Sequence, residues 1–62
     1  MTNDAIRQRL QAIPLGGNAK IAGLIVERVA TCERWVVNVG VHGFWVDIDG
    51  AVERIKLEAR PT

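Results

Sequence analysis

RWVVNVGVHGFWVDIDGA, residues 34–51, holds both tryptophans, the only phenylalanine and the only histidine of this 62-residue chain. Apolar residues alternate along most of the stretch, and a strand sends alternate side chains to opposite faces of a sheet. Trp35, Val37 and Val39 therefore share one face, which we expect to form the core. The next apolar set consists of Phe44, Val46 and Ile48. Trp45 alternates with these residues, so we expect its side chain to point away from the core.

The same stretch predicts a β-hairpin whose two-residue loop is His42-Gly43. In that register Val39 lies opposite Val46, and Trp45 lies beside Gly40 on the neighbouring strand. A slip of one residue would move every apolar side chain to the other face. Because histidine tolerates positive φ, we interpret His42 as a turn residue and not as a catalytic base.

After the hairpin, Asp49-Gly50 is a second hairpin signal. The segment RIKLEAR, residues 54–60, alternates strictly and predicts a strand with one face in solvent. Val52 and Ile55 also fit a helix, so strand and helix both remain open for residues 51–60.

Before the hairpin, NDAIRQRLQAI, residues 3–13, predicts a helix capped by Asn3 or Asp4 and ended by Pro14. KIAGLIVERVA, residues 20–30, is rich in β-branched residues and predicts one strand, with a buried helix over residues 24–29 as the less favoured alternative. Both parities of this strand are apolar in its first half, which indicates that both of its faces are covered for at least part of its length. TCER, residues 31–34, is expected to form the next turn.

Together these elements predict a single α+β domain over residues 1–62, with an N-terminal helix packed on a four-stranded antiparallel meander. A small, curled SH3-like barrel is the alternative, because short meanders tend to close on themselves. The expected core consists of apolar residues from all of these elements: Ile6, Leu10, Ile13, Trp35, Val37, Val39, Phe44, Val46, Ile48, Ile55 and Leu57.

The length and the cysteine count bear on how such a domain is stabilised. A chain this short buries only about 60% of the surface that its unfolded form exposes. The single cysteine, Cys32, excludes an intrachain disulfide, and one cysteine with one histidine cannot form a structural zinc site. Oligomerisation therefore remains as a source of additional stability.

The net charge of +1, from eight Lys or Arg and seven Asp or Glu, gives no strong signal for nucleic acid or membrane partners. No apolar run approaches the roughly 20 residues of a membrane span. The first residues lack the basic-then-apolar order of a signal peptide. We therefore expect a cytoplasmic protein without membrane partners.

The residues with chemical potential do not combine into a catalytic pattern, so we expect no enzyme, no metal and no cofactor. Cys32 lies beside Glu33 without a second cysteine, which indicates an incidental thiol. Residues 47–50, DIDG, lack the later ligands of a calcium loop and are interpreted as a structural turn. The glycine-rich residues 15–20, LGGNAK, lack the spacing of a phosphate-binding loop.

Trp45 is the residue that most strongly suggests a function. One interpretation is that its ring only covers Gly40. The favoured one is a protein-interaction module that acts through the outward face around Trp45, Val36, Asn38 and Asp47. Its partner would be a second copy, in a homodimer, or a larger protein on which it acts as an accessory, regulatory or inhibitor protein.

The alternative function is a weak nucleic-acid-binding β-sheet protein. It would use Arg7 and Arg9 on the helix and a row of Arg54, Lys56 and Arg60 on the last strand. We rank it second, because Asp47, Asp49 and Glu58 occupy or adjoin the same outer face and would repel phosphate.

Overall fold

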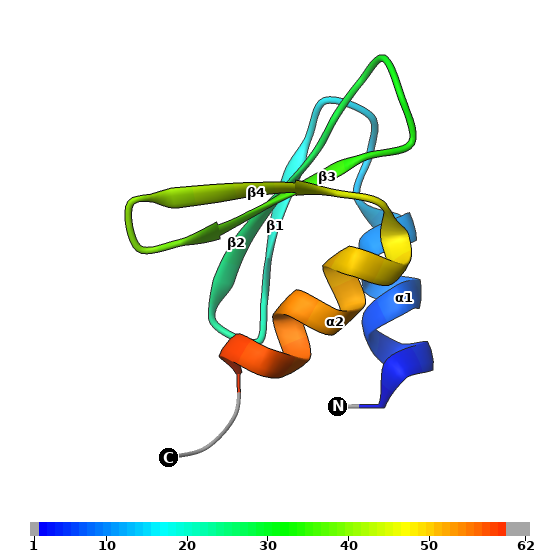
Figure 1. Cartoon of the computed structure of the whole chain (residues 1–62). Coiled ribbons are helices and arrows are strands. Elements are labelled where there is room, and N and C mark those ends of the chain that lie inside the picture. The colour runs from blue at the N-terminus through cyan, green and yellow to red at the C-terminus, as the bar shows by residue number, and fades with distance from the viewer. Residues whose placement is uncertain (1, 60–62) are drawn as a thin grey trace.

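The computed structural model describes residues 2–59 and contains, in chain order, α1 (Asn3–Ala12), β1 (Asn18–Ile21), β2 (Leu24–Arg28), β3 (Trp35–Val39), β4 (His42–Val46) and α2 (Ile48–Glu58). The strands form an antiparallel sheet in the order β1-β2-β3-β4. The α+β class, with an N-terminal helix packed on a four-stranded antiparallel sheet, is confirmed. Both helices lie on one face of this twisted sheet (Figure 1). The sheet is open, with β1 and β4 at its edges, so the alternative of a closed SH3-like barrel is wrong.

The N-cap of helix α1 lies one residue earlier than the sequence suggests. This N-cap is Thr2, whose hydroxyl oxygen accepts a hydrogen bond from the backbone N–H of Ala5 at 3.1 Å, so the expected cap at Asn3 or Asp4 is wrong. The helix ends as predicted before Pro14, because the preceding residue is extended, with ψ of 124°.

The segment predicted as one long strand over residues 20–30 is instead the hairpin of β1 and β2. The chain reverses at Ala22-Gly23, where φ is 51° and 84°. Positive φ at both loop positions is typical of a type I′ turn, for which Asn-Gly is the usual signal. Alanine rarely adopts this conformation, so the turn is not visible in the sequence. Within the chain itself the second face of this segment is not covered at Ile25, which is 47% exposed.

The β3–β4 hairpin turns at Gly40-Val41 and not at His42-Gly43. Val39 pairs with His42, so its predicted pairing with Val46 is wrong, and His42 is the first residue of β4 instead of a turn residue. Gly40 has φ of 61°, as the first loop position of a type II′ turn requires. The residue of β4 that pairs with each position of β3 differs from the predicted one by an even number of residues. Each side chain therefore lies on the face predicted for it.

The predicted C-terminal strand is wrong, because residues 48–58 form helix α2; this settles the alternative in favour of a helix. Asp49-Gly50 is accordingly not a hairpin loop. Asp47 is the N-cap, and its carboxylate accepts a hydrogen bond from the backbone N–H of Gly50 at 2.8 Å. The helix buries Ala51, Val52 and Ile55, whereas Leu57, expected in the core, is 54% exposed.

The core lies between the sheet and the two helices, and its buried residues are Ile6, Leu10, Ile13, Ile21, Val26, Trp35, Val37, Ala51, Val52 and Ile55. Phe44, Val46, Val39 and Ile48 pack against it while partly buried. Arg28, which the sequence did not single out, connects β2 to the end of α1. Its guanidinium donates to the carbonyls of Gln11 and Ile13 at 3.1 and 2.9 Å. A cation at this position also compensates the partial negative charge of a helix C-terminus.

Candidate functional site

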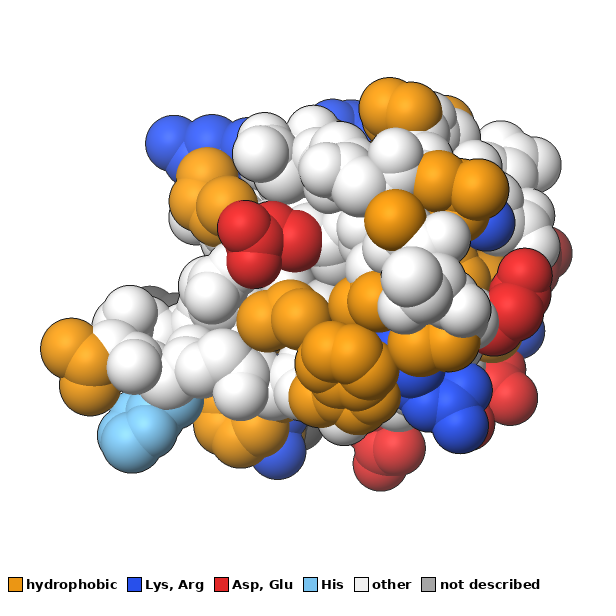
Figure 2. Space-filling model, turned by 90° about the horizontal axis from the view of Figure 1, so that it is seen from above, with side chains coloured by type: hydrophobic (Ala, Val, Ile, Leu, Met, Phe, Trp, Pro, Cys, Tyr) orange, Lys and Arg blue, Asp and Glu red, His pale blue; other side chains and the backbone are white. Residues whose placement is uncertain are grey.

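The face of the sheet opposite the helices carries no further layer of the described chain (Figure 1). We call this surface the open face. The strand pairings place eight residues on it: Asn18, Lys20, Ile25, Glu27, Val36, Asn38, Gly43 and Trp45. Figure 2 looks onto the side of β4 away from α2, and there hydrophobic groups lie between polar and backbone surface. His42, the only pale-blue side chain, stands on the projecting β3–β4 hairpin.

Trp45 lies on the open face as predicted, and its side chain is 60% exposed. It pairs with Val36 and not with Gly40. A Cβ atom added to Gly40 would have no neighbour within 4 Å, so the interpretation that the ring covers this glycine is wrong. At Gly43 the nearest atoms would be those of Val36 and Asn38, at 3.1 and 3.4 Å, and not the indole. The exposed ring therefore covers neither glycine of the hairpin.

Three apolar side chains form a diagonal strip across the open face. Val36 lies directly opposite Trp45, and Ile25 is diagonally adjacent to Val36 because it pairs with Asn38. Diagonal neighbours on a sheet are within reach of aromatic and long side chains. The strip of Ile25, Val36 and Trp45 thus extends from β2 to β4, the edge strand.

The polar residues of the predicted interface have different roles. Asn38 lies on the open face, but its amide donates to the backbone carbonyl of Ile25 at 3.0 Å and so fastens β3 to β2. Asp47 does not belong to this face, because it caps α2. Lys20 and Glu27, which the sequence did not single out, are exposed there instead.

The basic residues proposed for nucleic acid do not form a row on a strand. Arg54 and Lys56 lie on α2, and Arg60 lies outside the described residues. The guanidinium of Arg54 lies 4.1 Å from the centroid of the Phe44 ring and 3.1 Å from the carboxylate of Glu58. Arg7 pairs with Asp49 at 2.7 Å. The predicted row of basic residues on a last strand is therefore wrong, whereas Arg7 and Arg9 lie on α1 as expected.

The remaining reactive groups are separated from one another. Cys32 is exposed in the loop between β2 and β3, and His42 is exposed at the start of β4. Over residues 2–59 there is no group of three His, Cys, Asp or Glu side chains that could hold a metal ion. Neither of the two helices in this part of the chain has the length and apolar character needed to cross a bilayer.

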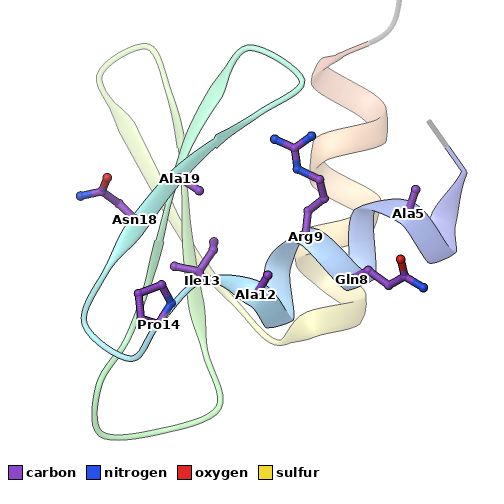
Figure 3. A pocket seen from close by; sticks show the side chains of 8 residues that line it. All are labelled: Ala5, Gln8, Arg9, Ala12, Ile13, Pro14, Asn18 and Ala19. Atoms are coloured by element: carbon purple, nitrogen blue, oxygen red, sulfur yellow. The ribbon is translucent and has the colours of Figure 1, made fainter.

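A groove of about 420 Å³ separates α1 from the edge strand β1 (Figure 3). Small and apolar residues predominate in its lining, which consists of Ala5, Gln8, Arg9, Ala12, Ile13, Pro14, Asn18 and Ala19. Arg9 projects from α1 toward β1 and donates to the backbone carbonyl of Lys20 at 3.1 Å. Sequence patterns did not indicate this groove, because its lining comes from two elements that face each other only in the folded chain. Comparison with family models, curated proteins and solved structures finds no match to this chain.

Proposed function

We propose that this protein is a non-enzymatic interaction module whose open face is covered by a second copy of the chain. The observation that carries the proposal is the exposure of Trp45, at 60%, on a sheet face that neither helix covers. Tryptophan is among the residues most enriched at interface hot spots. The strip formed with Ile25 and Val36 supplies an apolar centre that an interface of this kind needs.

The charges on the open face favour a second copy over a strongly charged partner. The face carries one cation, Lys20, and one anion, Glu27, on neighbouring strands. In a twofold-symmetric dimer the same patch meets itself, so residue i contacts residue j and j contacts i. Lys20 of each copy can then approach Glu27 of the other, which gives two complementary pairs without net charge.

The open face is small for a protein–protein interface, and small interfaces are typical of weak, transient association. Four strands of four or five residues cover about 300 Å² in projection at the usual strand spacing. A standard interface buries about 800 Å² on each partner. We therefore expect a weak dimer, with a dissociation constant on the order of 10–100 μM.

Light scattering over a concentration series from about 5 μM to 1 mM spans this expected range. We expect the mass to rise from monomer to dimer, and we expect Trp45→Ala to weaken dimerisation about thirtyfold or more. Leu57→Ala is the matched control, because it removes a similarly exposed apolar side chain, 54% against 60%, from outside the open face. Circular dichroism checks that both variants keep their fold.

A monomer at every concentration would contradict the proposal, as would equal effects of Trp45→Ala and Leu57→Ala. If a monomeric chain instead binds a larger protein through Trp45, the partner is not a second copy and the accessory or inhibitor role takes its place. The proposed setting is the cytoplasm, since the single cysteine excludes the intrachain disulfides on which small secreted domains commonly depend.

We do not propose nucleic-acid binding. Arg7 and Arg54 are each paired with a carboxylate of the protein itself, and Arg54 and Lys56 lie on α2 instead of forming a row on a strand. Tight binding to a nucleic acid that weakens steeply with salt would contradict this ranking, since phosphate contacts release counterions.

A further inference from the structure

We infer that the groove between α1 and β1 binds the C-terminal end of an extended peptide, with the terminal carboxylate on Arg9. This site uses residues other than the strip on the open face, so it can stand or fail independently of the dimer. The inference combines three features of the groove: an edge strand, a single charge and an apolar floor.

The first feature is the backbone of β1, which lies at the edge of the sheet. The N–H of Arg28 donates to the carbonyl of Gly17 at 2.9 Å, so position 17 is hydrogen-bonded to β2. In an antiparallel pair such positions alternate, and Asn18 and Lys20 consequently turn their backbone N–H and C=O groups away from β2. An added peptide strand pairs with outward groups of this kind, as in β-augmentation.

The second feature is the position of Arg9. Among the described residues that line the groove, it alone carries a charge, and its guanidinium donates to the outward carbonyl of Lys20 at 3.1 Å. Arg9 therefore lies on the path that the main chain of an added strand would follow. The N–H of an internal peptide bond would compete with the Arg9 guanidinium for the carbonyl of Lys20. A terminal carboxylate would instead accept a charge-assisted hydrogen bond from the guanidinium. This placement selects a chain end over an internal segment.

The third feature is the apolar floor between the two elements. Ile13 and Ala19 point into the groove, and Ala12 lies along its helix side (Figure 3). The volume of about 420 Å³ accommodates a peptide end with one apolar side chain directed into the groove. Side chains alternate along an added strand, so this apolar residue would be the last one, or the residue two positions before it.

The test is a titration of ¹⁵N-labelled protein, monitored by NMR, with six-residue peptides that end in alanine, valine, leucine or phenylalanine. Each peptide is used as the free acid and as the C-terminal amide. We expect at least one free acid to shift the amide signals of Asn18 and Lys20 saturably at concentrations up to about 5 mM. We expect the matching amide to bind at least about tenfold more weakly, because it lacks the charge that Arg9 recognises.

Two variants and two controls assign the site. Arg9→Gln should weaken binding about ten- to hundredfold, as loss of a hydrogen bond to a charged group does. Ala12→Leu should abolish binding by filling the groove. Arg34→Gln removes an exposed arginine of the β2–β3 loop that donates to the carbonyl of Glu33, and it should bind normally. Trp45→Ala should also bind normally, which separates this site from the strip of Ile25, Val36 and Trp45.

The inference is overturned if none of the free acids shifts the β1 signals, or if acid and amide bind equally well. It is also overturned if Arg9→Gln and Arg34→Gln bind alike, or if the shifts map to the strip of Ile25, Val36 and Trp45 and disappear in Trp45→Ala. The last result would leave the dimer proposal in place and assign peptide binding to the sheet surface.

Discussion

The indole N–H of Trp35 donates a 3.0 Å hydrogen bond to the backbone carbonyl of Leu10, 25 residues away in the chain. Within a continuous helix that carbonyl would receive the N–H of residue 14, but residue 14 is a proline and has none. The N–H of Ile13 reaches the same oxygen at 3.3 Å. The indole of Trp35 on β3 thus supplies a hydrogen-bond donor to a backbone carbonyl at the end of α1. This explains why the position needs an aromatic residue that carries an N–H donor.

Trp35→Phe keeps a large apolar ring and removes the N–H. We expect a loss of about 1–3 kcal/mol in the free energy of unfolding, because the Leu10 carbonyl keeps only the longer bond from Ile13 and the smaller ring fills less of the core. Trp35→Ala should cost about 3–5 kcal/mol through loss of a buried aromatic, which would leave a domain of this size largely unfolded. Urea denaturation measures both effects, and a Trp35→Phe protein as stable as the original would contradict the assigned role of the hydrogen bond.

Ala22 has φ of 51° in the turn between β1 and β2. A non-glycine residue in this region costs roughly 1–2 kcal/mol. Asparagine tolerates it better, and Asn-Gly is the preferred type I′ pair, so Ala22→Asn should raise the free energy of unfolding by about 0.5–1 kcal/mol. Gly23→Ala is the opposite control: φ of 84° makes it strained although the added Cβ meets nothing within 4 Å. If Ala22→Asn destabilises the chain, the turn has another conformation.

Asp47 and Asp49 provide a test of the start of α2. Asp47→Ala removes the N-cap and should cost about 1 kcal/mol. Asp49→Ala breaks the ion pair with Arg7, in which the Asp49 side chain is 75% exposed, and exposed pairs contribute little stability. Thermal unfolding of both variants at the same pH compares them. Equal losses would show that the carboxylate of Asp47 does not act as the cap.

The proposed dimer predicts a charge-reversal pattern on the open face. Lys20→Glu and Glu27→Lys should each weaken self-association about three- to tenfold, because each places like charges opposite one another. The double variant should recover most of the affinity. All three effects should shrink in 1 M salt, where the screening length falls to about 3 Å. Sedimentation equilibrium measures the constants, and a double variant as weak as the single ones would rule out this pairing.

The division of the sheet into two faces could be predicted from the sequence alone. Alternation places Trp35, Val37 and Val39 on one face and Trp45 on the other, and this assignment is correct. The strand partners could not be predicted as well, because moving the turn from residues 42–43 to residues 40–41 preserves the parity of every side chain. The face on which a side chain lies follows from the period of the strand alone. The register depends on which glycine takes the positive φ, and here it is Gly40.

Residues 48–58 show what only the tertiary structure decided. The alternation of Ile55, Leu57 and Ala59 suits a strand, and the spacing of Ile48, Ala51, Val52 and Ile55 suits a helix. The ten residues of α1 leave much of one face of the four-stranded sheet uncovered. Helix α2 covers the rest of that face and buries Ile55, whereas Leu57 becomes exposed. The groove on β1 and the open face around Trp45 follow from the same choice, since both depend on how two helices share one side of the sheet. Local periodicity determines which side chains lie on one face, but only packing against the rest of the chain determines which face is buried and what remains open.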